Sequence, residues 1–550
     1  MSTGSLHTQG IVRQVMWDRL LAIVEEQAQT LIRTSFSTTV REAGDLSAGV
    51  FDVRGRMLAQ AQTGTPGHVN SMACAVRHFL DVIPADTMQP GDCYVTNDPW
   101  LASGHLHDFT GVTPAFRDGR LVGLFAATIH VVDVGGRGLG TEGRSVFEEG
   151  IRIPILPFLR RGVVNADLLA IIRANTRTPL EVEGDLLSMA AAGDEGARRL
   201  ASMMREFGIE ALDELADYVI DTSRAGMLAA IRALPAGTYT NEMTVDGYES
   251  AIRFRAAMTI SDSRIHVDFD GTSPQSRFGI NVVMNYTLAY ASYGIRCVVG
   301  PHIPNNHGSL EVISMSAPAG SILNAAPPAP VAARHIMGHV LPDLMLGCLA
   351  EPCGGRVPAE SSLMWNPQFR GSRGFDGTPT DWQIYLFNSG GTGGAADRDG
   401  YSATAFPAGI RIVSTEAAEA AAPILIWRKE LACDTGGAGT HRGGLGQVVE
   451  VGSVTGDAFE LYAMFDRVEN APAGRAGGSD GATGEVRLAS GPTLSSKGIH
   501  SVPPGDRLVL SLPGGGGYGD PRARSRALVR DDVRLGYVSP DGARKAYGLD

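Results

Sequence analysis

Side chains that bind metals or transfer protons are concentrated between Asn97 and Gly136. This window contains three histidines and four aspartates. Glycine, proline and asparagine residues lie between them, and such residues build tight loops. Imidazole and carboxylate groups that rigid turns bring together serve both metal binding and general acid–base catalysis. The window is therefore the strongest candidate for a functional site.

His105 and Asp108 lie three residues apart, in a loop that follows a predicted strand, and His130 ends the next predicted strand, over 121–132. Two strands of one sheet that end at the same edge would bring these three side chains together. Two nitrogens and one oxygen leave coordination positions open for water, which is the pattern of a catalytic metal site. Asp45, in an earlier loop, is a candidate fourth ligand.

The spacing alone leaves another interpretation open. A His-x-x-Asp followed later by a histidine also arises by chance, and histidines are common on surfaces and in cores where other groups satisfy them. Asp133 is a candidate to orient His130 or to join the ligand set. His107 points away from Asp108 if the segment is extended, and it is therefore predicted to support the site from behind the ligands.

The composition excludes several classes of function. The chain has 550 residues, enough for more than one core, and a net charge of -12, which argues against nucleic acid as the main partner. Its six cysteines form no C-x-x-C pair, as expected of free thiols in a reducing compartment. The N-terminus lacks an apolar signal segment, and no apolar run reaches the roughly 18 residues of a membrane span. A cytoplasmic protein without a membrane partner is expected.

Hydrophobic periodicity predicts a mixed α/β fold with several domains. The expected helices cover 8–35, 68–83, 165–233, 287–299 and 332–350, and β-structure is expected over 38–60, 92–97, 121–132, 239–270, 461–465 and 507–512. The predicted domains are an α/β metal-binding domain (1–235), a mixed α/β domain (236–410), a β-rich domain (411–519) and a helical tail (520–550). Glycine clusters after residue 388 indicate turns or close approaches of the backbone.

Nucleotide binding finds little support in the sequence. The segment 267–272 is similar to a phosphate-binding hairpin of actin-like ATPases, but an ordinary turn at Asp270-Gly271 also explains it. No G-x-x-x-x-G-K-[ST] motif is present. We therefore predict no nucleotide-binding residues in this chain.

Several short motifs follow one another along nearly the whole chain. They are Arg41-Glu42 with Asp45-Leu46-Ser47, Asn97-Asp98-Pro99, His105-Leu106-His107-Asp108, His130 with 133–136, Glu149-Gly150-Ile151, Ala332-Ala333-Arg334-His335, 434–439 with 442–444, and 513–521. In this order the motifs resemble those of the hydantoinase B/oxoprolinase family. The members of that family are the metal-bearing subunits of N-methylhydantoinase-, oxoprolinase-, caprolactamase- and acetone carboxylase-type complexes.

The resemblance implies roles for particular residues. The family's metal ligands correspond to Asp45, His105, Asp108 and His130, and the metal would be zinc, manganese or iron. Asp45 or Asp133 would act as the catalytic proton acceptor. The remaining predicted site residues, expected to contact substrate, are His107, Gly135 and Gly136.

The resemblance also implies a division of labour between subunits. A hydantoinase A-type partner with an actin-like ATPase fold would use ATP to phosphorylate a small-molecule substrate, and this chain would then direct a metal-activated water at the activated carbonyl. The expected function is ATP-dependent hydrolysis of a cyclic amide, such as a hydantoin, lactam or 5-oxoproline-like ring, within a hetero-oligomer. Two alternatives stay open: a subunit of an ATP-dependent ketone carboxylase of the acetone or acetophenone type, and a non-catalytic scaffold subunit.

Overall fold

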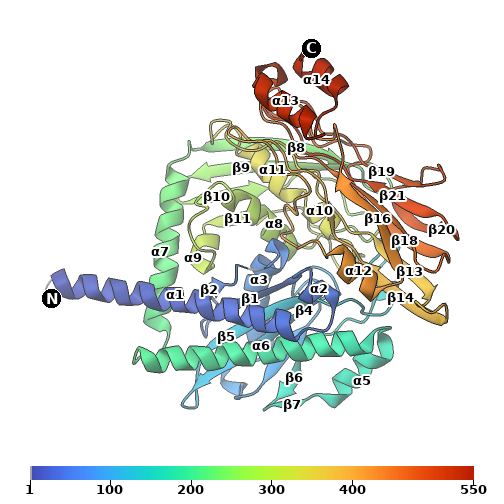
Figure 1. The fold of residues 1–550 in the computed structure, drawn as a ribbon. Coiled ribbons are helices and arrows are strands. Elements are labelled where there is room, and N and C mark those ends of the chain that lie inside the picture. The colour runs from blue at the N-terminus through green and yellow to red at the C-terminus, as the bar shows by residue number, and fades with distance from the viewer. Residues whose placement is uncertain (1–2, 63, 550) are drawn as a thin grey trace.

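The computed structural model describes residues 3–62 and 64–549. Helices and strands are mixed over this part of the chain, which confirms the predicted α/β class (Figure 1). The N-terminal part is built on a large sheet with long helices, and the C-terminal part is rich in strands.

An antiparallel seven-stranded sheet organises the N-terminal part, in the order β2-β1-β5-β4-β3-β6-β7. Its strands are β1 (Leu46–Phe51), β2 (Met57–Gln60), β3 (Cys93–Thr96), β4 (Asp108–Arg117), β5 (Arg120–His130), β6 (Leu156–Arg160) and β7 (Val163–Val164). The hairpin expected within 38–60 corresponds to β1 and β2, which pair antiparallel.

The hairpin of β4 and β5 determines the geometry of the site. Its two turn residues, Asp118 and Gly119, both have positive φ (49° and 76°), as tight hairpin turns of this type require. The register set by the turn places Asp108 opposite His130 at the far end of the hairpin. The sequence pattern did not predict β4, because it contains a glycine and a proline, which are unfavourable inside strands.

Helices cover both faces of this sheet. Successive side chains of a strand point to opposite faces, so neighbouring residues of one strand pack against different helices. On β5, Phe125 packs with residues of the helices on one face, whereas Leu124 packs with Met72 and Phe79 of the helix on the other face. The covering helices are α1 (Thr3–Thr34), α6 (Pro179–Glu206) and α7 (Asp213–Arg232) on the first face, and α3 (Pro66–Val82) on the second (Figure 1).

The middle of the chain forms a smaller sheet with its own helices. The strand order is β11-β10-β9-β8, and β10 and β11 run parallel. Its elements are β8 (Gly237–Val245), β9 (Ile252–Ser261), β10 (Arg264–Asp268), β11 (Ile313–Ser316), α8 (Met284–Arg296), α10 (His335–Gly338) and α11 (Leu341–Cys348). Because α8 packs against both α3 and α11, it joins this region to the N-terminal sheet.

Two four-stranded sheets with a shared core form most of the C-terminal part. Their orders are β14-β13-β18-β20 and β16-β17-β21-β19, and the core between them includes Trp365, Phe369, Leu461 and Leu510. The strands are β13 (Gln368–Arg373), β14 (Pro379–Tyr385), β16 (Ile424–Leu431), β17 (Gln447–Ser453), β18 (Phe459–Met464), β19 (Glu485–Leu488), β20 (Lys497–Val502) and β21 (Arg507–Ser511). Since β13 pairs with β18, strand pairing crosses the predicted boundary at 410. The division into domains stays a prediction.

Shorter elements complete the fold. They are α2 (Thr38–Arg41), η1 (Ala85–Thr87), α4 (Val146–Glu149), α5 (Ala166–Asn175), α9 (His307–Leu310), β12 (Met364–Trp365), β15 (Asn388–Ser389), α12 (Thr415–Ala421), η2 (Pro521–Ala523), α13 (Arg526–Arg534) and α14 (Pro540–Tyr547). The last two give the predicted helical tail, which sits at the end of the C-terminal sheets (Figure 1). No helix in 3–62 or 64–549 combines the length and the apolar character needed to cross a bilayer.

The glycine-rich segments pack against one another through their backbones. We call the segments 390–394, 436–444, 474–481 and 514–517 the glycine bundle. Their peptides bond directly between segments: the Gly444 N–H donates to Thr392 O (2.8 Å), and the Gly515 N–H donates to Gly444 O (2.9 Å). A Cβ on Gly515 would lie 2.0 Å from Thr392 O, so a side chain has no room there. The close backbone approach that the glycine clusters indicate is therefore present.

Candidate metal centre

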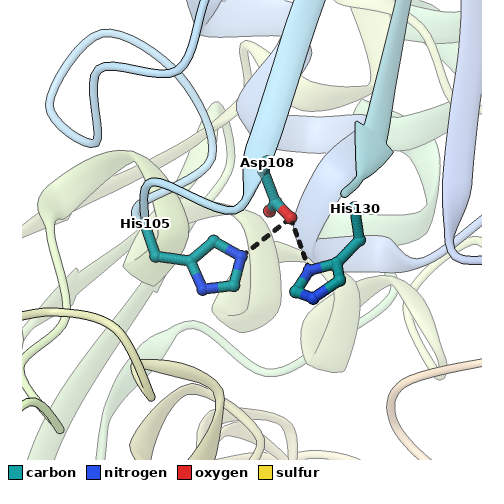
Figure 2. A group of neighbouring side chains, drawn as sticks. All are labelled: His105, Asp108 and His130. Atoms are coloured by element: carbon teal, nitrogen blue, oxygen red, sulfur yellow. Dashed lines mark hydrogen bonds and ion pairs between the residues drawn. The ribbon is translucent and has the colours of Figure 1, made fainter. Parts of the chain in front are cut away.

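His105, Asp108 and His130 come together at one edge of the seven-stranded sheet. Asp108 is the first residue of β4, His130 is the last of β5, and His105 lies in the loop before β4 (Figure 2). One potential ligand atom from each lies within 4.8 Å of the other two. Asp108 Oδ1 is 2.7 Å from His105 Nε2 and 3.0 Å from His130 Nδ1. All three residues are buried, which is how a metal site in a protein interior is built.

The two carboxylate oxygens of Asp108 have separate partners. Oδ1 faces the two imidazoles, as Figure 2 shows. Oδ2 accepts a hydrogen bond from the Ser103 hydroxyl (2.7 Å), lies 2.8 Å from His68 Nε2, and forms an ion pair with Arg334. Although burial acts to raise the pKa of Asp108, the neighbouring His105, His68 and Arg334 lower it well below its usual value. Asp108 is therefore an anion at neutral pH, with Oδ1 available to a cation.

The main chain fixes the protonation of His105. Its Nδ1 lies 2.8 Å from the carbonyl oxygen of Ala332, which can only accept, so Nδ1 carries the hydrogen. Burial, together with the nearby Arg334 guanidinium, lowers the pKa of His105 to about 4. The ring is thus neutral, and its Nε2 presents a lone pair toward Asp108. A metal ligand needs this tautomer.

Asp45 borders the same group from the loop before β1. Its Oδ2 lies 3.9 Å from His130 Nδ1 and its Oδ1 lies 3.6 Å from His68 Nδ1. Oδ1 is buried and has no hydrogen-bond partner in the described part of the chain. The structure thus places Asp45 beside the three ligands, with one oxygen uncommitted.

A small cavity of about 30 Å³ adjoins these residues. The volume accommodates about two water-sized spheres. Its walls come from three regions of the chain: the N-terminal sheet and α3, the helices α8 and α10, and the start of the C-terminal part. Prominent lining residues are Asp45, His68, His105, His130, Tyr286, Tyr290, Arg334, His335, His339 and Asn366.

Four of these lining residues carry an imidazole or a charge and had no role assigned from the sequence. His68 lies in the first turn of α3, and Arg334 immediately precedes α10, so both reach Asp108 from distant segments. His335 and His339 are buried, and burial lowers their pKa values, to about 3 for His339, which keeps both rings neutral. The one available signal was that a charged residue and two histidines interrupt the apolar stretch predicted as a buried helix.

Other predicted site residues lie outside the cavity wall. His107 is fully buried behind His130, with its ring stacked on the His130 ring at a centroid distance of 5.4 Å. Burial, together with the nearby His130 and His105, lowers the pKa of His107 well below its usual value. It supports His130 through ring packing and is not placed to meet a substrate in the cavity.

Asp133, Gly135 and Gly136 also differ from the sequence prediction. The Asp133 carboxylate accepts a hydrogen bond from the Gly135 N–H (3.1 Å) and pairs with the backbone and side chain of Arg177. Both oxygens of Asp133 are therefore occupied by contacts that hold a turn. Gly135 and Gly136 have positive φ (75° and 54°) and pack on the backbone of Asn175 and Glu149, which explains why glycine is needed in this turn.

Comparison with known proteins agrees with this arrangement. A model of the hydantoinase B/oxoprolinase family matches residues 9–521. The chain belongs to this family. It is 30% identical to an uncharacterized protein of Methanocaldococcus jannaschii over 96% of this chain and 93% of that protein. It is 28% identical to a putative D-/L-hydantoinase subunit of a Pseudomonas species, over 98% of this chain and 95% of the relative.

A solved structure extends the similarity to three dimensions. The crystal structure of the ATP-dependent caprolactamase from Pseudomonas jessenii superposes with a TM-score of 0.91 and 26% identity, covering 98% of this chain and 96% of the other. The hydantoinase B/oxoprolinase fold is thus shared along the whole chain.

The donor set of this family member suits a divalent cation. The Nε2 lone pair of His105 and Oδ1 of Asp108 are buried polar atoms that face each other, and the buried Oδ1 of Asp45 has no hydrogen-bond partner among the described residues. Such atoms are costly to bury unless another group satisfies them. Two imidazoles with one or two carboxylates suit zinc, manganese or iron(II).

Proposed function

We propose that this chain is the metal-dependent subunit of an ATP-dependent hydrolase of cyclic amides, with a hydantoin, a lactam or a 5-oxoproline-like ring as substrate. The observation that carries the proposal is the buried His105–Asp108–His130 group beside a cavity. Family membership and the similarity to a caprolactamase and to a hydantoinase subunit support this substrate class.

The cation would be held by His105, Asp108 and His130, with Asp45 as the adjacent fourth group. A divalent metal bound there would act as a Lewis acid, acidifying a water and polarising the substrate carbonyl. Arg334 and His68 keep Asp108 in its anionic form, and Ala332 keeps the Nε2 of His105 free of a proton.

Asp45 is the group best placed to accept a proton from the attacking water. Asp45 lines the cavity, and its Oδ1 is buried and has no hydrogen-bond donor among the residues described. A carboxylate with a free lone pair at this position can act as a general base. Asp133 has no such capacity, because both of its oxygens are bonded to Arg177 and Gly135.

The energy for opening an amide ring would come from a partner. Two relatives are described as subunits, of a hydantoinase and of caprolactamase, and the caprolactamase is ATP-dependent by its description. We therefore propose a hetero-oligomer in which a hydantoinase A-type, actin-like ATPase subunit phosphorylates the substrate. The burial of His105, Asp108 and His130 would keep bulk water away from the metal group.

The test is an assay of the complex formed with the ATPase partner. Hydantoins, lactams and 5-oxoproline are supplied with ATP, ring opening is followed by mass spectrometry, and metal content is measured on the same samples. We expect ring opening that requires both ATP and metal, that a chelator abolishes, and that the added metal restores.

Two results would contradict the proposal. One is ring opening that persists in metal-free His105→Ala protein, since the metal group would then be dispensable. The other is the absence of ring opening together with bicarbonate-dependent consumption of a ketone, which would assign the carboxylase reaction instead.

A further inference from the structure

Arg296, at the end of α8, is a buried cation without an anionic partner. Five arginines are at most 9% exposed in the described part of the chain, and Arg296 is one of them. The other four are paired with carboxylates: Arg334 with Asp108, Arg442 with Asp532, Arg467 with Glu360, and Arg524 with Asp399 and Asp532. Among residues 3–62 and 64–549, no carboxylate oxygen comes within 4.0 Å of the Arg296 guanidinium.

The contacts of Arg296 leave its charge uncompensated. One terminal nitrogen donates to the sulfur of Met227 and the other to the carbonyl of Ile303, whereas Nε has no acceptor among the described residues. Burial lowers the pKa of Arg296 to about 10, so the group is still protonated at neutral pH. A buried charge is normally paired, because its loss of hydration is otherwise unopposed.

A cavity of about 440 Å³ is lined in part by Arg296. Among the described residues, Arg296 is the only charged side chain that lines it, and the amides of Gln60, Asn70 and Asn305 supply further polar groups. Asn305 already donates to Gln60 and Asn70, which orders the three amides into one network. The volume lies within the usual range for small-molecule sites, about 300–1,000 Å³.

Helix α3 adds a second electropositive element. Pro66, Val69 and Asn70, all in or next to its first turn, line the cavity. Thr65, the residue before the helix, makes no side-chain capping bond. The N-terminus of a long helix carries a partial positive charge, which favours an anion. The N–H groups of His68 and Val69 already donate to Thr65 O (3.0 and 3.2 Å), so the helix contributes its dipole rather than free donors.

The cavity lies directly behind the wall of the candidate metal centre. Adjacent residues are divided between the two: Thr65 lines the metal cavity and Pro66 this one, and Ile410 and Gly409 are divided in the same way. On α8, Tyr290 lines the metal cavity and Tyr293 this one. The Thr65 hydroxyl lies 3.2 Å from the Tyr290 hydroxyl and completes the wall.

We propose that this cavity is a binding site for a small organic oxyanion, with its carboxylate or phosphate on Arg296 and its polar groups on the amides of Gln60, Asn70 and Asn305. The site is separate from the metal ligands and does not depend on the reaction proposed for them. Because it rests on α3 and α8, which also carry His68 and Tyr290, an occupant would contact the two helices that wall the metal cavity.

The test is isothermal titration calorimetry of the full chain with three probes. Inorganic phosphate and N-acetylglycine each provide an oxyanion, and N-methylacetamide provides the amide without the charge. We expect one or both anions to bind and the neutral amide to bind at least about tenfold more weakly, since a hydrogen bond to a charged group contributes more than one between neutral groups. If phosphate binds more tightly, the natural ligand carries a phosphate; if N-acetylglycine does, the ligand carries a carboxylate.

Variants locate the binding. Arg296→Gln is expected to weaken anion binding at least about tenfold, Arg296→Lys to retain part of it, and Asn305→Ala to weaken N-acetylglycine in particular. Arg77→Gln removes a charge from the exposed side of α3 and is the matched control, with binding unchanged. Binding should also persist in His130→Ala, which separates this site from the metal group.

The stability of the ligand-free variants gives a second readout. Removing an uncompensated charge should leave Arg296→Gln at least as thermally stable as the unmodified chain, whereas removing a merely structural arginine should destabilise it. The proposal is overturned if neither anion binds, if Arg296→Gln and Asn305→Ala both bind as the unmodified chain does, or if binding disappears in His130→Ala.

Discussion

The candidate metal centre and the glycine bundle are two buried regions that use the chain in opposite ways. At the metal centre, strand pairing fixes the backbone and the chemistry resides in side-chain end groups such as Asp108 and His130. In the glycine bundle most residues are glycines, and peptides pack directly against one another, as Gly515 against Thr392 illustrates. The difference teaches that a substitution in the first region should remove function and spare the fold, whereas one in the second should do the reverse.

Buried aspartates show the same contrast. At the metal centre, Asp108 is surrounded by cationic groups, which hold its pKa well below the usual value despite its burial. Asp343 of α11 bonds to the backbone N–H of Ser361 (2.8 Å), close to the bundle, and burial together with the nearby Glu360 raises its pKa to about 7. The surroundings of Asp108 thus favour its ionised form, whereas those of Asp343 favour the protonated form up to a pH of about 7.

The largest effect is expected from His130→Ala. Losing one of three ligands should remove the bound metal and lower turnover about a thousandfold or more, since metal catalysis contributes several kcal/mol to the barrier. The fold should persist, because Asp108 keeps Ser103, His68 and Arg334. Metal analysis, turnover and circular dichroism measure the three quantities. His302→Ala, at an exposed histidine, is the control, and unchanged metal content in His130→Ala would remove this residue from the ligand set.

Gly515→Ala should produce the opposite result. Its new Cβ would lie 2.0 Å from Thr392 O, so the bundle must open, at a cost of about 3 kcal/mol in the free energy of unfolding. Protein that still folds should bind its normal complement of metal. Urea unfolding with metal analysis checks both points. Gly10→Ala, in α1 where nothing lies within 4 Å, should not destabilise the protein, and equal costs for the two changes would refute the tight packing.

His68→Gln should have an intermediate effect confined to the metal centre. It removes the imidazole 2.8 Å from Asp108 Oδ2, and loss of a group that orients a ligand typically weakens metal binding by about 10–100-fold. Competition with a chelator measures the affinity. The same change at His307 of α9, which is half-buried, pairs with Glu311 and does not line the metal cavity, should leave the affinity unaltered. An unaltered affinity in His68→Gln would instead show that Asp108 is sufficiently held by Arg334 and Ser103.

The smallest effect is a pH dependence due to Asp343. Between its unfolded pKa of about 4 and its folded pKa of about 7, the folded state binds one more proton than the unfolded state. The contribution of Asp343 to the free energy of unfolding is therefore fully present below about pH 4. It falls by about 1 kcal/mol per pH unit as the pH rises to about 7. Asp343→Asn should remove this component. Urea unfolding at pH 5, 6 and 7 compares the two slopes, and identical slopes would show that Asp343 is ionised in the fold.

Local sequence information predicted much of the fold and some of the site. Strand β5 and helix α3 follow from hydrophobic periodicity, and His105, Asp108 and His130 stand out as ligand types near predicted strand ends. Strand β4 was missed because its glycine and proline disfavour a strand in isolation, whereas pairing with β3 and β5 on both sides outweighs that preference.

The partners of the ligands were beyond local prediction. His68 reaches Asp108 across 40 residues of sequence and Arg334 across 226, and no short-range periodicity relates such positions. The ion pair of Asp133 with Arg177 was beyond local prediction for the same reason, since it joins residues 44 positions apart.

The sequence by itself determined the types of candidate ligand, their order, and the glycines that permit close backbone packing. These are local properties, set by donor chemistry and by the absence of a Cβ. Only the tertiary structure decided which oxygen of Asp108 faces the imidazoles, which residues neutralise the other, and which buried arginine lacks an anion. Those outcomes depend on distances between segments far apart in the chain, and the packing of α3, α8 and the sheet edge sets them.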